Sequence, residues 1–205
     1  AHGSRDTDGD GFVDGWEIAN GLDPLDSGNT QHRTPPEPTH SGFFVLELNQ
    51  RLAPAHVENF ASHVENDMYD GTIFHRTSDL QGGDFENGDG SGGYAANWYG
   101  YCNGQSGGIE NDCSMSDWTI PDEADNGLTH TSGALSMAKT SSPNTGGSQF
   151  FIVPSDSNPS HLDGVHTVFG YVTNGLDSIT DISEVDINNN DKPTYDVIVE
   201  SITID

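Results

Sequence analysis

From Phe43 onward the chain offers only short apolar runs, separated by long stretches of Gly, Asn, Asp and Ser. The clearest runs cover residues 43–49, 148–154, 166–172 and 197–204. Short runs of this kind, rich in Val, Ile and Phe and bounded by turn residues, predict β-strands. With 32% apolar residues and 25 glycines among 205 residues, the composition favours a loop-rich β protein over a helical bundle.

Two segments carry helical periodicity instead. The first begins near Pro54, which suits a first helical turn, and its apolar residues recur at intervals of three and four: Val57, Phe60, Ala61 and Val64. The second is shorter and has three apolar residues on one face: Leu176, Ile179 and Ile182. Many short strands with two helices predict a mainly β fold, a closed barrel capped by two helices.

The net charge of −27, from 33 acidic and 6 basic residues, restricts the partners. Such a surface repels phosphate, so we expect no nucleic-acid partner. Because the chain has no run of about 18 apolar residues, we expect no membrane span. Two interpretations of the charge stay open, solubility and cation binding.

The only two cysteines, Cys102 and Cys113, lie in one polar, Gly-rich stretch. A disulfide there would close a loop that cannot pack a core of its own, and would contribute roughly 3 kcal/mol. Two free thiols are the alternative. The disulfide is favoured because the composition is typical of extracellular proteins, and it predicts a secreted or periplasmic location.

Residues 1–26 form a separate unit that matches a twelve-residue calcium loop. Three carboxylates alternate at its first, third and fifth positions, and Gly11 follows where the chain must turn. An acidic, disordered leader is the alternative to a calcium site. The predicted ligands are Asp6, Asp8, Asp10, the backbone carbonyl of Phe12, Asp14 and Glu17.

Only five residues precede Asp6 in this sequence, so we expect no incoming helix before the calcium loop. It resembles the extracellular dockerin-like or thrombospondin type 3 repeats, in which similar loops run on into segments like GLDPLD (21–26). The resemblance implies a structural Ca²⁺ and not a switch. Residues 27–42 are polar with three prolines and predict a linker, so the second domain is expected at 43–205.

Five segments of the second domain carry the functional signal: FHR (74–76), QGGD (81–84), LSMA (135–138), PNTGGSQFFI (143–152) and HLDGVHTVFGYV (161–172). Their order and content resemble the cyclophilins. The resemblance covers nearly all of residues 43–205. It implies a closed eight-stranded antiparallel barrel capped by two α-helices, and peptidyl-prolyl cis-trans isomerase activity on proline-containing polypeptides without a cofactor.

The resemblance also implies roles for individual residues. Arg76 matches the catalytic arginine, and Gln81 matches the glutamine that holds the substrate backbone. The proline pocket would have Phe151 as its floor, Met137 and Leu162 as walls, and His166 at its side. The strip that pairs with the substrate backbone would be Ala138, Lys139 and Thr140, with Lys139 in place of the usual asparagine.

The sequence departs from the family pattern in two further places. Only four residues separate FHR from QGGD, whereas the family has seven, including a phenylalanine that closes the pocket; Leu80 and Phe85 are candidates to replace it. His161 stands where many members have the tryptophan that donates to cyclosporin, so we expect weak cyclosporin binding.

Three functions remain open at this stage. The first is an active isomerase that acts on secreted or periplasmic proteins, and the second is a proline-peptide-binding module with weak or no catalysis. The third is a calcium-dependent extracellular structural protein. The sequence does not define the client proteins or the oligomeric state.

Overall fold

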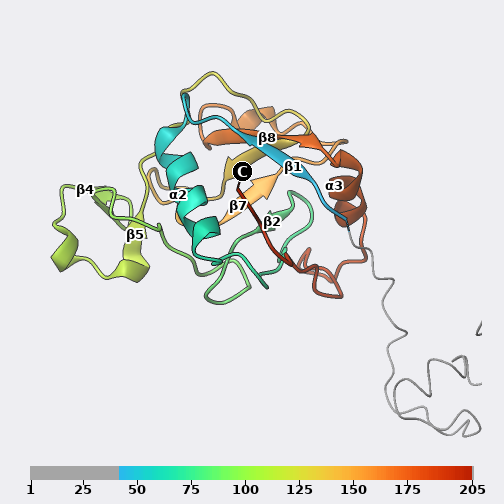
Figure 1. Ribbon diagram of the computed structural model, residues 1–205, viewed down its shortest axis with the longest axis horizontal. Helices are drawn as coiled ribbons and strands as arrows, with labels where there is room; N and C mark the ends of the chain where they lie inside the picture. The colour runs from blue at the N-terminus through green and yellow to red at the C-terminus, as the bar shows by residue number, and fades with distance from the viewer. Residues whose placement is uncertain (1–41, 205) are drawn as a thin grey trace, which may run out of the picture. The chain divides into compact units, whose positions relative to one another are not determined.

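The computed structural model describes residues 42–204 of the chain (Figure 1). The predicted calcium loop, with its ligands from Asp6 to Glu17, and residues 27–41 of the predicted linker lie outside the described residues. Two α-helices are present: α2 (Pro54–Glu65) and α3 (Leu176–Ser183). The strands are β1 (Val45–Leu48), β2 (Gln81–Gly82), β3 (Tyr101–Cys102), β4 (Gln105–Ser106), β5 (Trp118–Thr119), β6 (Ala134–Met137), β7 (Phe150–Ile152) and β8 (Val168–Asn174).

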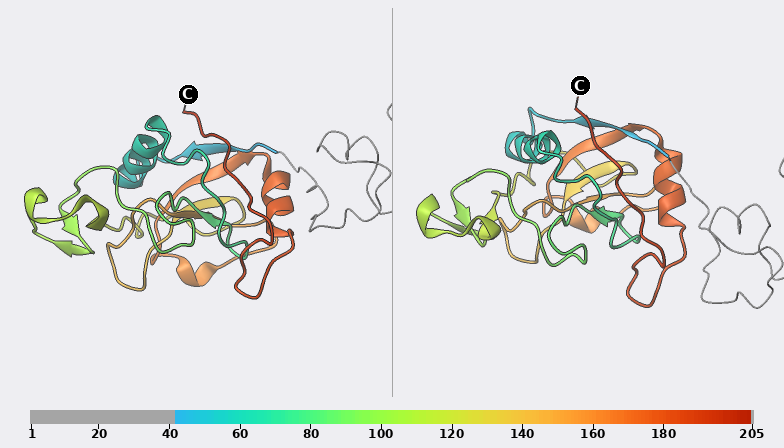
Figure 2. Two further views of the ribbon diagram at one scale, coloured as in Figure 1. Left: turned by 90° about the horizontal axis from the view of Figure 1, so that it is seen from below. Right: turned by 60° about the horizontal axis from the view of Figure 1, so that its bottom comes forward.

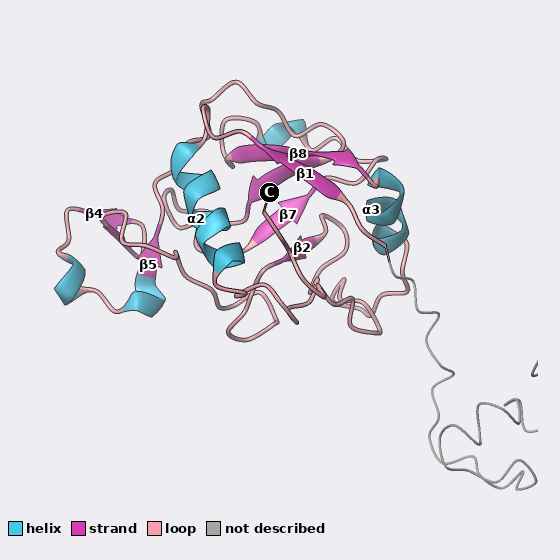
Figure 3. Cartoon of the chain, viewed as in Figure 1, coloured by secondary structure: helices cyan, strands magenta, loops and turns pink. Residues whose placement is uncertain are grey.

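The strands form two antiparallel sheets. The larger has the order β1-β8-β6-β7-β2 and lies between the two helices, and the smaller has the order β4-β3-β5 (Figure 3). Antiparallel sheets with two helices were expected, but a single closed eight-stranded barrel is not found in residues 42–204. The hydrogen-bonded pairing between strands is interrupted by register shifts within β1 and β6. Several other pairings are reduced to isolated bridges.

The predicted strand at 197–204 is an example of such a reduced pairing. Its backbone exchanges three hydrogen bonds with residues 71–74, including Phe74 N to Val197 O at 2.9 Å and Val199 N to Thr72 O at 2.8 Å. Val197 and Val199 pack against the core, while Ile198 is 57% exposed. The segment therefore covers the core as an extended chain without forming a continuous ladder.

The main core lies between α2 and one face of the larger sheet. Val57, Phe60 and Val64 of α2 are buried, as the periodicity predicted. Phe60 packs edge-on against Phe150, with ring centroids 5.6 Å apart, and Ile179 of α3 is fully buried in the same cluster. These contacts fix the sheet against both helices (Figure 1).

The opposite face of the larger sheet carries a second, smaller apolar cluster. It contains Ala134, Ala138, Phe151, Val153 and Val168, with Leu128, Leu162 and Tyr171 packed against it. Side chains alternate between the two faces of a strand. Phe150 therefore enters the main core, whereas its neighbour Phe151 belongs to the second cluster.

The predicted disulfide between Cys102 and Cys113 is formed, with the two Cα atoms 6.0 Å apart. It connects β3 to the segment between two short 3₁₀ turns, η1 (Glu110–Asp112) and η2 (Met115–Asp117). Within residues 42–204, neither helix is long and apolar enough to cross a bilayer.

Candidate active site

Phe151 belongs to the second apolar cluster. Its side chain lies between two histidine rings: His130 is stacked at 5.7 Å between centroids, and His166 meets it edge-on at 5.8 Å. Leu162, on the 3₁₀ turn η3 (Ser160–Leu162), packs against the same cluster. The structure thus brings together three of the residues expected around the proline ring: Phe151, Leu162 and His166.

Gln81 and Arg76 lie on the sheet face that carries Phe151. Gln81 is the direct partner of Phe151 in the β2–β7 ladder, and Arg76 forms a bridge with Gln81. Directly opposed residues in an antiparallel pair share a face. The backbone bond from Gln81 N to Arg76 O, at 2.8 Å, fixes this arrangement.

The guanidinium of Arg76 has contacts within its own turn. Its Nη2 lies 3.2 Å from Asp79 Oδ2, and its Nε donates to Ser78 Oγ at 3.0 Å. The side chain is still 47% exposed. Since arginine has five N–H donors, these two contacts orient the group and leave donors for another acceptor.

The amide of Gln81 is held by Gln149, a residue that the sequence analysis did not single out. Gln81 Nε2 donates to Gln149 Oε1 at 2.8 Å. Gln149 in turn donates through Nε2 to the carbonyl of Gly90 at 3.0 Å and to that of Gly92. Gln149 directly precedes the FFI run, so its place in the GGSQFF segment was the signal that could have identified it.

The loop that receives Gln149 is organised by the buried carboxylate of Asp84. Burial by itself raises the pKa of Asp84, but hydrogen bonds from backbone N–H groups outweigh it and bring the pKa to about 2. The donors include Asn87 N at 2.9 Å and Gly90 N at 2.9 Å. Because Asp84 stays ionised, it holds the loop, and through Gln149 the loop orients Gln81.

Burial lowers the pKa of His166, although its bond to a backbone carbonyl opposes the shift. Its Nδ1 lies 3.1 Å from Met137 O. His130 was missed from the sequence, because it lies 21 residues from Phe151 and outside every motif. Its Nδ1 is 2.8 Å from Asp163 Oδ1, and its Nε2 is 3.0 Å from Ser136 Oγ.

The expected substrate strip follows β6. Ala138 already donates its N–H to Gln149 O at 2.9 Å, so that group is committed to the sheet. The ammonium of Lys139 lies 3.5 Å from Asp122, and its side chain is only 5% exposed. Thr140 is exposed, as is His161 on η3. The charge of Lys139 is therefore compensated by a neighbour and is not free at the rim.

The structure does not bring Met137 together with Phe151. Met137 is 1% exposed and belongs to the main core, because its side chain lies on the other face of β6 from Ser136 and Ala138. We therefore remove Met137 from the expected pocket walls. Leu80 is fully buried in the main core, and Phe85 packs on His63 and Tyr94, so neither replaces the missing phenylalanine beside Phe151.

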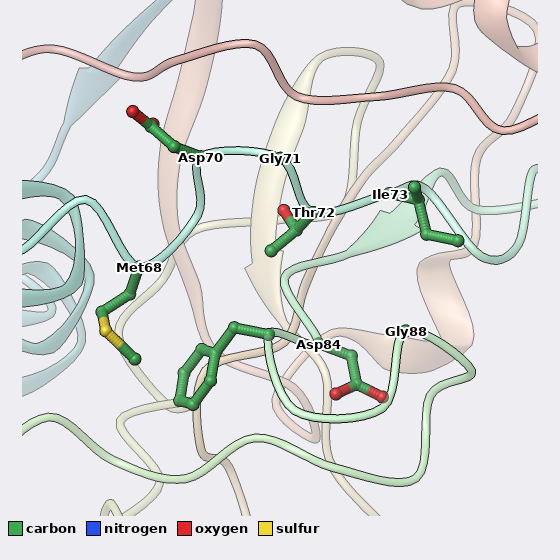
Figure 4. Close-up of a pocket in the computed structure, with 8 residues that line it drawn as sticks. Met68, Asp70, Gly71, Thr72, Ile73, Asp84 and Gly88 are labelled. Carbon is green, nitrogen blue, oxygen red and sulfur yellow. The ribbon is translucent and has the colours of Figure 1, made fainter.

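A surface hollow of about 290 Å³ lies between residues 68–73 and 84–88 (Figure 4). None of its lining residues belongs to the cluster around Phe151. Within residues 42–204, no group of three His, Cys, Asp or Glu side chains is arranged to hold a metal ion.

Comparisons with known proteins identify the family of the chain. The family model for cyclophilin type peptidyl-prolyl cis-trans isomerase/CLD matches residues 37–204, and that for the bacterial TSP3 repeat matches residues 6–27. A peptidyl-prolyl cis-trans isomerase of Acinetobacter baylyi is 37% identical over 153 residues, which cover 72% of this chain and 70% of that protein. A Staphylococcus aureus protein, provisionally named a peptidyl-prolyl cis-trans isomerase, is 33% identical over 196 residues. The match covers 82% of this chain and 89% of that protein.

Among solved structures, a Cryptosporidium parvum cyclophilin type isomerase, crystallised in the presence of the dipeptide Ala-Pro, has a TM-score of 0.64 and 28% identity. The match covers 78% of this chain and 90% of that one. The chain belongs to the cyclophilin-type peptidyl-prolyl cis-trans isomerases and carries a bacterial TSP3 repeat in its N-terminal part.

Proposed function

We propose that this isomerase acts on Xaa-Pro bonds of secreted or periplasmic polypeptides, with the proline ring on Phe151 and the twisted amide stabilised by Arg76. The observation that carries the proposal is the shared sheet face: Arg76, Gln81 and Phe151 occupy three adjoining positions on it. The apolar cluster around Phe151 suits a pyrrolidine ring, and two polar side chains stand beside it.

The chemistry required of these residues is limited. Rotation about the amide has a barrier of about 20 kcal/mol, because planarity gives the C–N bond partial double-bond character. As the bond twists, the lone pair localises on the prolyl nitrogen. A guanidinium N–H of Arg76 can donate to that nitrogen, and this contact is stronger in the twisted state than in either planar one.

Supporting roles in the proposal belong to Gln81, Ala138, Lys139, Thr140 and Leu162. Gln81 would bond the substrate backbone, because Gln149 already fixes its amide. Residues 138–140 would lie along the substrate chain, and Leu162 and His166 would border the ring. His166 acts as a neutral wall, since burial lowers its pKa.

The disulfide supports an oxidising compartment, and the TSP3 repeat supports a structural Ca²⁺ bound by the Asp6–Glu17 loop. No cofactor has a role in the proposed reaction. The partners are proline-containing polypeptides.

A second candidate is a proline-peptide-binding module with weak catalysis. It is favoured by the pairing of Arg76 Nη2 with Asp79, which holds part of the guanidinium within its own turn. The test is to measure peptide affinity and isomerisation rate separately for the wild type, Arg76→Ala and the exposed control Arg51→Ala. A rate reduced about a hundredfold in Arg76→Ala alone, at nearly unchanged affinity, supports catalysis. Equal rates in all three proteins would overturn it.

A further inference from the structure

The cysteine-bearing segment forms a separate structural unit, which we call the stapled lobe (residues 101–119). It projects from the side of the main fold beside α2 (Figures 1 and 2). The lobe has its own three-stranded sheet, the Cys102–Cys113 disulfide and a bond from Trp118 Nε1 to Cys113 O at 3.3 Å. These crosslinks give the lobe a fixed shape without a large core.

The turn of the lobe touches the loop beside the proposed substrate strip. Asn103 and Gly104 both have positive φ, at 48° and 79°, as the tight turn between β3 and β4 requires. A Cβ at Gly104 would lie 2.8 Å from Thr145 Cγ2 and 2.9 Å from Pro143 O. The backbone of the lobe therefore packs directly on residues 143–145.

Thr145 continues this contact into the strip. Its Oγ1 accepts the N–H of Thr140 at 3.1 Å and lies 2.8 Å from Thr140 Oγ1. Thr145 thus connects the lobe to Thr140, which is proposed to lie along the substrate backbone. Movement of Gly104 would displace Thr145, and with it Thr140.

The segment that leaves the lobe after β5 is fixed to the same region. Directly after β5, Ile120 donates its N–H to Gly146 O at 2.9 Å. Asp122 donates its N–H to Asn144 Oδ1 at 2.9 Å and pairs with Lys139. The β3–β4 turn of the lobe and the segment that follows β5 therefore both contact residues 143–146, which lie beside the strip.

The exposed surface of the lobe has a definite chemistry. Ile109 is 68% exposed and Met115 is 52% exposed, next to the exposed acids Glu110 and Asp112. No Lys, Arg or His occurs between residues 101 and 119. Apolar side chains flanked only by negative charge are complementary to a chain with apolar and basic residues.

We propose that the stapled lobe extends the substrate groove and binds the part of the client chain that flanks the proline, with a preference for apolar and basic side chains. This inference rests on the proposed function, because the strip at 138–140 is what joins the lobe to the reacting bond. The lobe would set substrate preference, and the chemistry would remain at Arg76 and Phe151.

The test compares three peptides that share one central Xaa-Pro bond. One has four residues, one has flanks of Leu and Lys, and one has flanks of Leu and Glu. The lobe variant is Glu110→Gln/Asp112→Asn. The control variant is Asp181→Asn/Glu184→Gln at the C-terminal end of α3, which removes one aspartate and one glutamate charge from exposed positions outside the lobe.

We expect the wild type to prefer the Lys-flanked over the Glu-flanked peptide by about threefold or more in kcat/KM, and the lobe variant to lose most of this preference. The control variant should retain it, and the four-residue peptide should react equally with all three proteins. An undiminished preference in the lobe variant, or an equal loss in the control, would overturn the inference.

Two further variants complete the test. Cys102→Ser/Cys113→Ser releases the lobe and should lower kcat/KM for the Lys-flanked peptide only. Arg76→Ala should lower the rate for every peptide. If Arg76→Ala leaves the rates unchanged, the proposed catalytic role of Arg76 is wrong. If Arg76→Ala lowers every rate but the lobe variants behave as the wild type does, only the role of the lobe is wrong.

Discussion

The imidazole of His130 lies parallel to the phenyl ring of Phe151, with the centroids 5.7 Å apart and the planes 8° from parallel. His130 is 1% exposed, and both of its ring nitrogens have partners, in Asp163 and Ser136. The histidine therefore acts as a fixed support behind the proposed floor of the proline site. Rotation of Phe151 away from its position would require breaking this packing.

Replacing His130 should affect both stability and substrate binding. His130→Ala leaves a cavity beside Phe151 and removes the partner of Asp163, and we expect a loss of about 3 kcal/mol in the free energy of unfolding. Because the phenyl ring of Phe151 would no longer be held by the imidazole, KM should also rise by about fivefold. Urea unfolding and isomerisation kinetics measure the two effects.

The matched control for His130→Ala is His56→Ala. His56 is equally buried and is also paired with a carboxylate, Glu123 at 2.8 Å, but it packs on Phe169 in the main core. It should lose stability without a change in KM. If the two variants have the same KM, His130 is only a core residue.

Phe150 and Phe151 give a second test, because adjacent residues of one strand point to opposite faces. Phe151→Leu should lower kcat/KM by about tenfold, since the flat surface under the proline ring is lost. Phe150→Leu should leave kcat/KM near the wild-type value and reduce stability by about 1 kcal/mol, because Phe150 packs on Phe60, Tyr69 and Phe74. Reversed effects would place the substrate on the other face.

His63 predicts how stability depends on pH. Burial lowers the pKa of His63 from 6.5 to about 4, against a smaller opposing effect of its hydrogen bond to Tyr94 O. The unfolded chain therefore binds this proton first as the pH falls, so the free energy of unfolding should decrease between about pH 6.5 and pH 4. The shift corresponds to about 3 kcal/mol at most.

The contribution of His63 is isolated with His63→Gln, which can still donate to Tyr94 O but does not titrate. Urea unfolding of both proteins at pH 7, 5.5 and 4 should give a flatter dependence for the variant. Parallel curves for the two proteins would contradict the assignment to His63.

The sequence predicted both helices and three of the four strongest strands, because their apolar spacing or composition matches their burial. The resemblance placed Met137 beside Phe151, although the alternation of side chains along β6 puts it in the main core. The motif context singled out Phe151, Gln81 and Arg76, and the structure places these three residues at adjoining positions on one sheet face.

The residues that were missed act through long-range contacts. His130 reaches Phe151 only because β6 and β7 pair, and Gln149 reaches Gly90 across a separation of 59 residues. No periodic pattern marks such residues. The short FHR–QGGD connection was visible in the sequence, but the pairing of Arg76 with Asp79 inside it depends on how the turn folds.

Cyclosporin binding tests the assignment of His161. The side chain is exposed on η3, beside Leu162, and replaces the tryptophan whose N–H donates to the drug in related proteins. We expect weak binding by the wild type and about tenfold tighter binding by His161→Trp, which restores that donor. Fluorescence titration measures both constants. A nanomolar dissociation constant for the wild type would contradict the prediction.

Calcium removal tests whether the TSP3 repeat and the isomerase domain are functionally independent. Calorimetry should detect binding of about one Ca²⁺ by the full chain, and Glu17→Ala should weaken it by at least about tenfold, because Glu17 is expected to supply two oxygen ligands. Glu65→Ala, an exposed glutamate at the end of α2, is the control and should bind as the wild type does.

Chelation should leave the rate on a four-residue peptide unchanged, since the proposed reaction uses only Arg76, Gln81 and the apolar site. Unaltered calcium affinity in Glu17→Ala would refute the ligand assignment, and a rate that falls on chelation would show that the repeat supports the active site.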